Sequence, residues 1–338
     1  MYEMENITDI TGISDYYMWE QACDKEDVSA FATLLTTILN SFIFIFSIIG
    51  NGLVLWVLIA YENFESVTNV FIFNLSIADL ILTLCLPFFI VYHRQGWIFG
   101  AVACKTFNAL FSVGFYSGII FLTFMTYHRY LAVVDPLSAL KTRRPAFKIM
   151  TSIIAWFLSI SASVPVIIFQ VETKYAGFNR CEYNEKIPEL VSNYQQNIFF
   201  LITFSVIIFC YFNIIKTLLK SQSQRNHKPV KLILVIVVVY FLSWSPYNII
   251  MLIHSLNQQN IFKDCEFIKK IDYAKYVSEK IAMSHCCLNP ILYAFVGIKF
   301  RRHLKNVLKC CCQCKHDALS TARHSSQYHC HNEDGSLY

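Results

Sequence analysis

The chain has 338 residues, of which 55% are hydrophobic and only 15% are charged. A soluble domain usually carries about 25% charged residues, so this composition indicates a membrane protein and argues against two soluble domains. The formal net charge of +5 is distributed unevenly, since acidic residues gather near the N-terminus and basic residues in three later clusters.

Residues 1–30 are expected to form an extracellular acidic segment, with eight acidic residues against one lysine. Because no basic stretch followed by an apolar core resembles a signal peptide here, we expect the first helix to carry this segment across the membrane. Asn6-Ile7-Thr8 is a glycosylation sequon and predicts a modified Asn6. Tyr16 and Tyr17 follow Asp15 and are expected to be sulfated; ordinary solvated tyrosines are the alternative.

Seven stretches are long and apolar enough to cross a hydrocarbon core of about 30 Å as helices. They cover about residues 31–60, 67–92, 101–134, 147–170, 190–219, 230–255 and 268–297. The pattern predicts an all-α membrane protein, with a seven-transmembrane helix bundle over residues 31–297.

Basic residues follow the third, fifth and seventh stretches, within 141–148, 216–231 and 299–309. By the positive-inside rule these clusters are cytosolic, which places the C-terminus in the cytosol and the N-terminus outside the cell. The loop 61–66 has two glutamates and no Lys or Arg, against the rule, but the three basic regions outweigh it.

Four of the 13 cysteines fall on the predicted outer side of the membrane: Cys23, Cys104, Cys181 and Cys265. Four cysteines permit three connectivities. A Cys104–Cys181 disulfide would hold the long loop after the fourth helix over the mouth of the bundle. Cys23 and Cys265 would then join the N-terminal segment to the last outer loop, and each bridge should contribute about 2 to 4 kcal/mol.

Asp79 lies within the second apolar stretch, where an aspartate costs about 2.5 to 3.5 kcal/mol and is a functional candidate for that reason. Further motifs occur along the other stretches: Gly50-Asn51, Asn74 to Asp79, His128-Arg129-Tyr130, Trp156, Ser243-Trp244-Ser245-Pro246 and Asn289-Pro290-Ile291-Leu292-Tyr293. In this order they resemble the rhodopsin-like G-protein-coupled receptors over about residues 23–310.

Within that family the chain looks like a chemokine receptor, on the evidence of Cys23 with Cys265, Leu86-Pro87, the stretch 97–100 and the stretch 285–290. Residues 121–134, 240–248 and 284–299 look closest to the XC class, that of the lymphotactin receptor. The resemblance implies a plasma-membrane receptor, not an enzyme, that couples chemokine binding to a heterotrimeric G protein of the inhibitory class, with calcium signalling and chemotaxis. No nucleic-acid partner is expected.

The resemblance also implies roles for single residues. Pro246 and Pro290 kink their helices, Trp244 lies at the floor of a ligand cavity, and Arg129 contacts the G protein in the active state. The implied set for activation and coupling is Asp79, His128, Arg129, Tyr130, Tyr211, Trp244, Pro246, Asn289, Pro290 and Tyr293. Plain core packing is the alternative for Trp244 and Tyr211.

Chemokine binding is implied to proceed in two steps. The acidic N-terminal segment attracts the basic body of the ligand, and the flexible ligand N-terminus then enters the bundle. Glu279 is the expected partner of the ligand amine, with a solvated rim glutamate as the alternative. The expected ligand-binding residues are Tyr16, Tyr17, Phe89, Phe111, Tyr247, His254, Lys275 and Glu279.

Three positions depart from the family pattern. Thr203 stands where a proline usually shapes the fifth helix. Gly118 replaces a residue that is usually a polar ligand of a sodium site. We therefore give equal weight to Na⁺ bound at Asp79, Asn51 and Asn289 and to an Asp79 that is hydrogen-bonded only by water and amide groups. No other cofactor is expected. His128 stands where most relatives carry Asp, and we expect a weaker resting restraint on Arg129.

Residues 298–309 are expected to form a short amphipathic eighth helix on the lipids of the inner leaflet, and residues 310–338 a cytosolic tail. Cys310, Cys311, Cys312 and Cys314 favour S-palmitoylation over a zinc site with His316. The tail also offers hydroxyl side chains to receptor kinases, and hence to arrestin, at Ser320, Thr321, Ser325 and Ser326.

Two other functions stay open at this point. A scavenging receptor that internalises chemokine without G-protein coupling is suggested by the altered residue before Arg129. A transporter or an intramembrane enzyme would need paired acids or a nucleophile with a base, and Asp79 stands alone in the apolar sequence.

Overall fold

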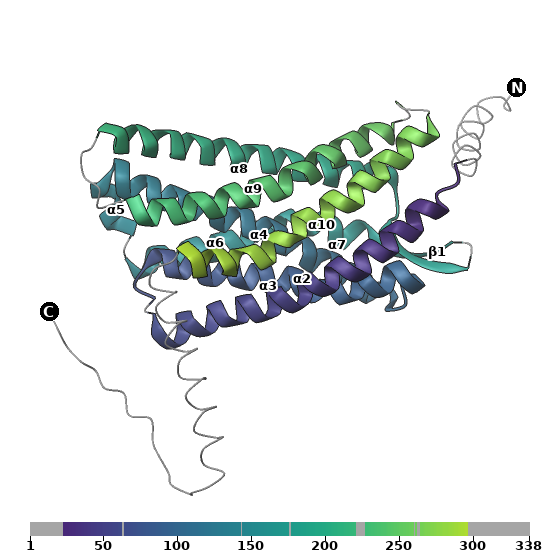
Figure 1. The fold of residues 1–338 in the computed structure, drawn as a ribbon, viewed down its shortest axis with the longest axis horizontal. Helices are drawn as coiled ribbons and strands as arrows, with labels where there is room; N and C mark the ends of the chain where they lie inside the picture. Colours follow the sequence, from purple (N-terminus) through teal and green to yellow (C-terminus); the bar gives the residue numbers. More distant parts are fainter. Residues whose placement is uncertain are drawn as a thin grey trace, which may run out of the picture.

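The computed structural model describes residues 23–62, 64–142, 144–175, 177–220, 227–259, 261 and 264–296. Within them, seven helical rods lie side by side along one long axis, and a two-stranded hairpin lies at one end (Figure 1). The predicted seven-helix bundle is confirmed. The predictions for Asn6, Tyr16, Tyr17, the helix 298–309 and the tail cysteines lie outside the described residues.

The rods follow the predicted apolar stretches closely. Between the third and fourth rods, α5 (Pro136–Thr142) forms a short connecting helix. The rods are α2 (Glu26–Tyr61), α3 (Val67–Gln95), α4 (Gly100–Val134), α6 (Pro145–Ala162) continued by α7 (Val164–Phe169), α8 (Lys186–Lys220), α9 (His227–Asn257) and α10 (Cys265–Val296).

Helix α4 is the centre of the bundle. In its apolar stretch 67% of the residues are buried, against 22% to 44% in the other five apolar spans. The remaining rods present much apolar surface outward, as expected where the solvent is lipid rather than water.

Helix α10 differs from the other rods in composition. Six spans in the described part of the chain are long and apolar enough to cross a membrane, and α10 is not among them despite its 32 residues. Its first half carries charged side chains that pair with α2 and α9 or with one another, including Lys269, Asp272, Glu279 and Lys280. It nevertheless packs beside α2 and α9, where the Asp272 and Lys280 side chains are largely buried.

Three details differ from a plain reading of the apolar pattern. Helix α2 begins at Glu26, before the expected start near residue 31, since Glu26 and Asp27 in its first turn favour a helix N-terminus. The fourth rod is interrupted at Ser163, two residues before Pro165. Helix α8 runs without interruption past Thr203, whose hydroxyl donates to the Phe199 carbonyl oxygen at 2.9 Å.

The hairpin was not predicted. Strands β1 (Gln170–Tyr175) and β2 (Phe178–Tyr183) pair antiparallel, with Glu172 opposite Cys181. Nothing in the apolar pattern marks it, because it lies between two rods and its position depends on the disulfide at Cys181.

Close helix packing explains one of the motifs. A side-chain carbon added at Gly50 would lie 2.9 Å from the ring of Pro290. Helices α2 and α10 therefore approach at a point where only glycine fits, next to the polar core residue Asn51.

Candidate functional site

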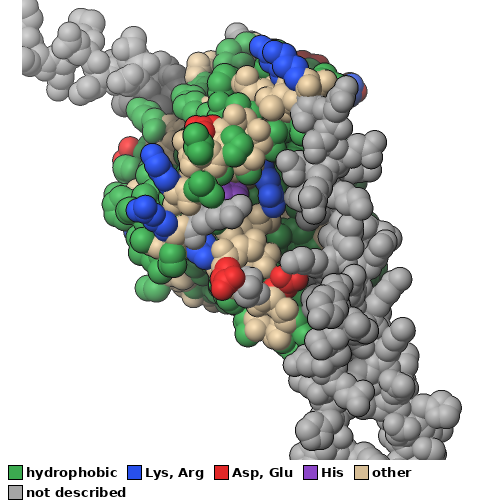
Figure 2. Space-filling model, turned by 90° about the vertical axis from the view of Figure 1, so that its left-hand side faces the viewer, with side chains coloured by type: hydrophobic (Ala, Val, Ile, Leu, Met, Phe, Trp, Pro, Cys, Tyr) green, Lys and Arg blue, Asp and Glu red, His purple; other side chains and the backbone are tan. Residues whose placement is uncertain are grey.

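The two ends of the bundle differ in the chemistry they present. We call the end with the hairpin and both disulfides the disulfide end, and the opposite end, where α5 lies, the basic end (Figure 1). Figure 2 shows the basic end, where Lys and Arg side chains lie among apolar side chains and a few Asp and Glu side chains. The described basic residues near this end include Arg129, Lys141, Arg144, Lys148, Lys216 and Lys220.

Both expected disulfides are present. Cys104 at the start of α4 is bonded to Cys181 on β2, and Cys23 is bonded to Cys265 at the start of α10. Trp97 is fully buried against the Cys104–Cys181 pair, and its backbone N–H donates to the Asn179 carbonyl oxygen at 2.8 Å. The loop before α4 therefore docks on the hairpin, which accounts for the Trp97-to-Gly100 motif.

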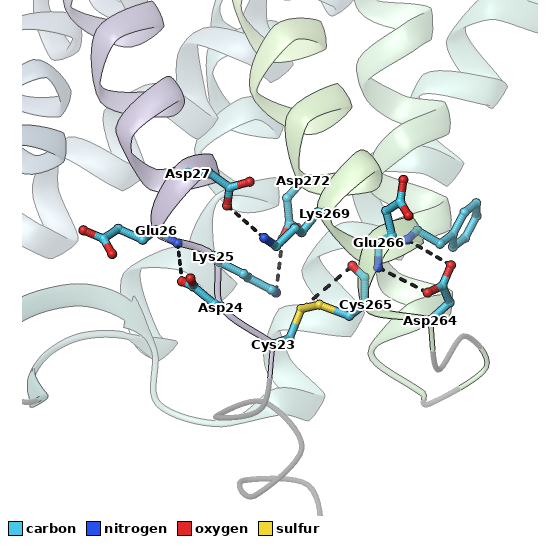
Figure 3. Close-up of a disulfide and its surroundings, with 11 residues drawn as sticks. Cys23, Asp24, Lys25, Glu26, Asp27, Asp264, Cys265, Glu266, Lys269 and Asp272 are labelled. Carbon is cyan, nitrogen blue, oxygen red and sulfur yellow. Dashed lines mark hydrogen bonds and ion pairs between the residues drawn. A yellow bond between two sulfur atoms is a disulfide. The ribbon is translucent and has the colours of Figure 1, made fainter.

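Two salt bridges reinforce the Cys23–Cys265 disulfide (Figure 3). Lys25 lies 3.1 Å from Asp272, and Lys269 lies 3.0 Å from Asp27. Each salt bridge joins the start of α2 to the first half of α10. In one of them α10 supplies the acidic residue, and in the other it supplies the lysine. We call these four residues the clasp.

The expected ligand-binding residues that the structure describes lie near the disulfide end on four helices, with Lys275 and Glu279 on α10. Phe89 on α3 and Phe111 on α4 make an edge-to-face contact with ring centroids 5.6 Å apart. Tyr247 on α9 contacts the Trp244 ring at 5.8 Å. His254 approaches Asp272 of the clasp at 3.9 Å, which links α9 to the same group of charges.

Glu279 is neither alone nor simply solvated. Its carboxylate lies 2.7 Å from the ammonium of Lys280, whose side chain is only 2% exposed, while that of Glu279 is 26% exposed. Neighbouring positions on a helix do not usually face each other, so the flexible lysine stem must bend back toward the carboxylate. The part of Glu279 that faces solvent remains open to a cationic ligand group.

Two grooves on the described surface lie away from these residues. One, of about 650 Å³, opens on the outer face of α3 and α6 and is lined by Val70, Ile149, Ile153 and Trp156, among others. The other, of about 500 Å³, lies between Glu26 and Arg94 at the disulfide end. The assignment of the ligand-binding residues therefore stays a prediction.

Polar residues of three helices meet in the core around Asp79. The Asn289 amide donates to Asp79 Oδ2 at 2.8 Å, and His285 Nε2 lies 3.5 Å from Asp79 Oδ1. Asn51 donates to the carbonyl oxygens of Ser47 and Cys286 at 3.1 and 2.9 Å, so it joins α2 to α10. Asp79, Asn51 and Asn289 are the residues predicted for a sodium site, and His285 belongs to the predicted motif at 285–290.

Trp244 lies directly above this core. Its ring is 1% exposed and contacts Phe115 of α4 at 4.5 Å and His285 of α10 at 5.5 Å. A movement of Trp244 would disturb both neighbouring helices. These contacts show the packing role of Trp244, and its role as a ligand-sensitive switch stays a prediction.

Arg129 at the basic end is held by a neutral partner. Its guanidinium donates to the Thr68 hydroxyl at 2.7 Å, and its Nε is buried with no hydrogen-bond partner among the described residues. Hydrogen bonds from the Ser138 side chain and backbone lower the pKa of the Asp135 carboxyl, which is engaged with α5 instead. Tyr130 packs its ring 6.1 Å from that of Phe209 on α8.

Sequence reasoning missed several of these contacts. Thr68 carries no signal in the sequence, because a threonine at a helix start is commonplace. Lys280 could have been identified from the sequence, because a lysine within a membrane helix is costly and is a functional candidate for the same reason as Asp79. Lys148 was counted only as a basic cluster member, yet its ammonium binds the carbonyl oxygens of Phe64 and Glu65 at 2.7 and 3.0 Å.

Comparison with known proteins agrees with this arrangement. Residues 50–293 match the family described as 7 transmembrane receptor (rhodopsin family). The chain is 44% identical over 307 residues to Chemokine XC receptor 1 of Homo sapiens, and the matched region covers 91% of each protein. It is 42% identical to Chemokine XC receptor 1 of Mus musculus over 299 residues, 88% of this chain and 90% of that protein. Its identity to C-C chemokine receptor type 8 of Homo sapiens is 33% over 311 residues, 90% of this chain and 88% of that protein.

Proposed function

Since this chain belongs to the rhodopsin family of seven-transmembrane receptors, and within it to the chemokine receptors, we propose that it binds an XC-class chemokine at its disulfide end and activates an inhibitory-class G protein at its basic end. The observation that carries the proposal is the contrast between those ends, joined by one continuous core. The choice of an XC-class ligand is supported by 44% identity to a relative of that name, against 33% to 38% to C-C receptors.

The orientation of the bundle follows from its two ends. Disulfides persist in oxidising space, so the disulfide end faces outside the cell. Basic residues gather at the opposite end, which fits the cytosolic face. With this orientation the acidic residues 1–30 meet a basic ligand before the bundle does, and their charge speeds the encounter.

The core supplies a route from ligand to G protein. The ligand N-terminus contacts Phe89, Phe111, Tyr247 and Glu279, and it displaces Trp244. Trp244 contacts His285, which lies beside Asp79. A shift of α9 against α4 and α10 then frees Arg129 from Thr68, a two-state change that the ligand biases by differential affinity.

Partners in the cytosol complete the proposal. Inner-leaflet lipids hold the helix 298–309, palmitate modifies the cysteines 310–314, and kinases and arrestin act on the tail. Asn6 carries glycan and Tyr16 and Tyr17 carry sulfate on the outer side. Peptide mass spectrometry of the mature receptor tests each modification directly.

A scavenging receptor is the second candidate function. His128 beside Arg129 is the residue that favours it, because a changed arginine environment can weaken nucleotide exchange while ligand uptake continues. The Thr68 bond argues for retained coupling, since it leaves the arginine releasable.

Guanine-nucleotide exchange on membranes that contain the receptor separates the two functions. We expect exchange on the inhibitory-class G protein to rise with an XC-class chemokine and to stay basal with C-C chemokines. Arg129→Ala should abolish the rise and leave ligand binding intact. Ligand uptake without exchange would establish the scavenger instead, and binding of no XC-class ligand would refute the assignment.

A further inference from the structure

Three side chains with metal-binding atoms converge in the centre of the bundle. Asp79 comes from α3, and His285 and Cys286 come from α10. Each is 1% exposed, and one ligating atom from each lies within 4.8 Å of the other two. We call these three residues the core triad.

The spacing of the triad fits a small tetrahedral ion. His285 Nε2 lies 3.5 Å from Asp79 Oδ1 and 3.6 Å from Cys286 Sγ. Zinc bonds of about 2.0 Å to nitrogen and oxygen and about 2.3 Å to sulfur separate tetrahedral ligands by about 3.3 and 3.6 Å. These two observed distances match the expected separations, and the ligand atoms of Asp79 and Cys286 lie within 4.8 Å of each other.

Hydrogen bonds around the triad orient it for metal binding. His285 Nδ1 contacts the Ala282 carbonyl oxygen, which can only accept, so Nδ1 carries the hydrogen, and in the neutral imidazole Nε2 presents its lone pair toward Asp79. Asn289 donates to Asp79 Oδ2, and the structure gives Oδ1 no hydrogen-bond partner among the described residues. An imidazole anchored through its second nitrogen and a carboxylate anchored through its second oxygen are the usual outer-shell arrangement of a metal site.

We propose that the core triad binds a divalent ion of the zinc type, through Asp79 Oδ1, His285 Nε2 and the Cys286 thiolate. The thiol proton leaves to solvent as the ion binds. Three protein ligands leave the fourth position of the ion for a water molecule.

The donor set distinguishes this site from a sodium site. Sodium needs several oxygen ligands, whereas two of the three triad atoms are nitrogen and sulfur, which borderline and soft ions prefer. Gly118 adds no side-chain oxygen. Asn51 donates its amide nitrogen to backbone carbonyl oxygens of α2 and α10, while the amide oxygens of Asn51 and Asn289 have no hydrogen-bond partner among the described residues. Sodium and zinc would share Asp79 and therefore compete, and the nitrogen of His285 and the sulfur of Cys286 favour zinc.

The bound ion would brace the bundle beneath Trp244. It would join α3 to α10, while the His285 ring contacts Tyr240 and Trp244 of α9 at 5.0 and 5.5 Å. Zinc should therefore stabilise the arrangement of the three helices seen here and resist displacement of Trp244.

Metal binding to the full chain in lipid nanodiscs tests the proposal without any chemokine. The background carries Ser at positions 310, 311, 312, 314 and 330, which removes the five tail cysteines as competing ligands. Co²⁺ serves as the spectroscopic probe, because a cobalt–thiolate bond gives a charge-transfer band, and Zn²⁺ is then titrated against it. We expect one ion per receptor with that band.

Cys286→Ser is the decisive variant and Cys287→Ser its matched control. The Cys287 thiol donates to the Ile43 carbonyl oxygen at 3.3 Å and is not in the triad. Loss of an outer-shell partner lowers metal affinity by about 10- to 100-fold, so Cys286→Ser should lose at least that much and the charge-transfer band. Cys287→Ser should keep both.

The proposal is overturned if Cys286→Ser binds cobalt as the parent does, if the parent binds none, or if only Na⁺ binds in an Asp79-dependent way. Asp79→Asn, which keeps the shape of the side chain, provides the same test should Cys286→Ser fail to fold. Because the readout is metal binding in the absence of ligand, failure here leaves the receptor function untouched.

Discussion

The disulfide end and the basic end of this bundle are held in opposite ways. At the disulfide end, two covalent bonds and the two bridges of the clasp fix the starts of α2, α4 and α10. At the basic end, the arginine of the central helix is held by one hydroxyl, that of Thr68. A receptor needs both conditions, since a fixed end presents a stable ligand surface and a loosely held end can change partners.

Removal of the Cys104–Cys181 bond is the strongest way to break this contrast. The paired change Cys104→Ser with Cys181→Ser should lower the free energy of unfolding by about 2 to 5 kcal/mol, because the loop of the hairpin is released. Thermal unfolding of the receptor in nanodiscs measures the loss. Cys287→Ser is the matched control, and an equal melting temperature in the paired variant would show that the bundle holds the hairpin unaided.

Glu279→Gln should have the next largest effect. It leaves the buried Lys280 ammonium without its partner at 2.7 Å, which costs roughly 1 to 3 kcal/mol. We also expect chemokine-induced calcium release to weaken more than binding of ligand to the receptor surface.

The double variant Glu279→Gln with Lys280→Gln separates the two effects. It removes the unpaired charge, so stability should recover, but the calcium response should stay weak if Glu279 contacts the ligand amine. Equal potency of Glu279→Gln and the parent in the calcium assay would exclude that contact.

The restraint on Arg129 can be shifted in both directions. Thr68→Val removes its hydroxyl partner and should raise ligand-free nucleotide exchange roughly fivefold, equivalent to about 1 kcal/mol. His128→Asp adds a carboxylate beside the arginine and should lower it. Tyr127→Phe on the same turn is the control. Unchanged basal exchange in both variants would mean that the restraint lies elsewhere.

The clasp should give the smallest effect. Asp272→Asn removes the contacts to Lys25 and His254, but Lys25 is 36% exposed, so the loss should be at most about 1 kcal/mol and smaller still at high salt. Lys270→Gln, which breaks a fully exposed pair with Glu266, should change nothing measurable. A larger loss of unfolding free energy in Asp272→Asn would show that the salt bridges, rather than the disulfide, hold this end.

The course of the chain through the membrane was predictable because its signal is local. Apolar length located six of the seven rods, the motif at Asn289-Pro290 marked the more polar α10, and the costly Asp79 marked the core. Contacts that depend on the packed bundle were not predictable: the hairpin that carries Cys181, the bond from Arg129 to Thr68, and the bend of Lys280 toward Glu279. The core triad needed the structure too, since Asp79 and His285 are 206 positions apart and their facing atoms follow from the packing of α3 on α10.

Spin-label distances across both ends of the bundle test the central claim most directly. Label pairs on α4 and α9, introduced as unnatural amino acids so that the cysteines stay native, report each end with and without an XC-class chemokine. We predict that ligand lengthens the distance at the basic end and leaves the distance at the disulfide end almost unchanged. Equal movement at both ends, or none at the basic end, would contradict the account.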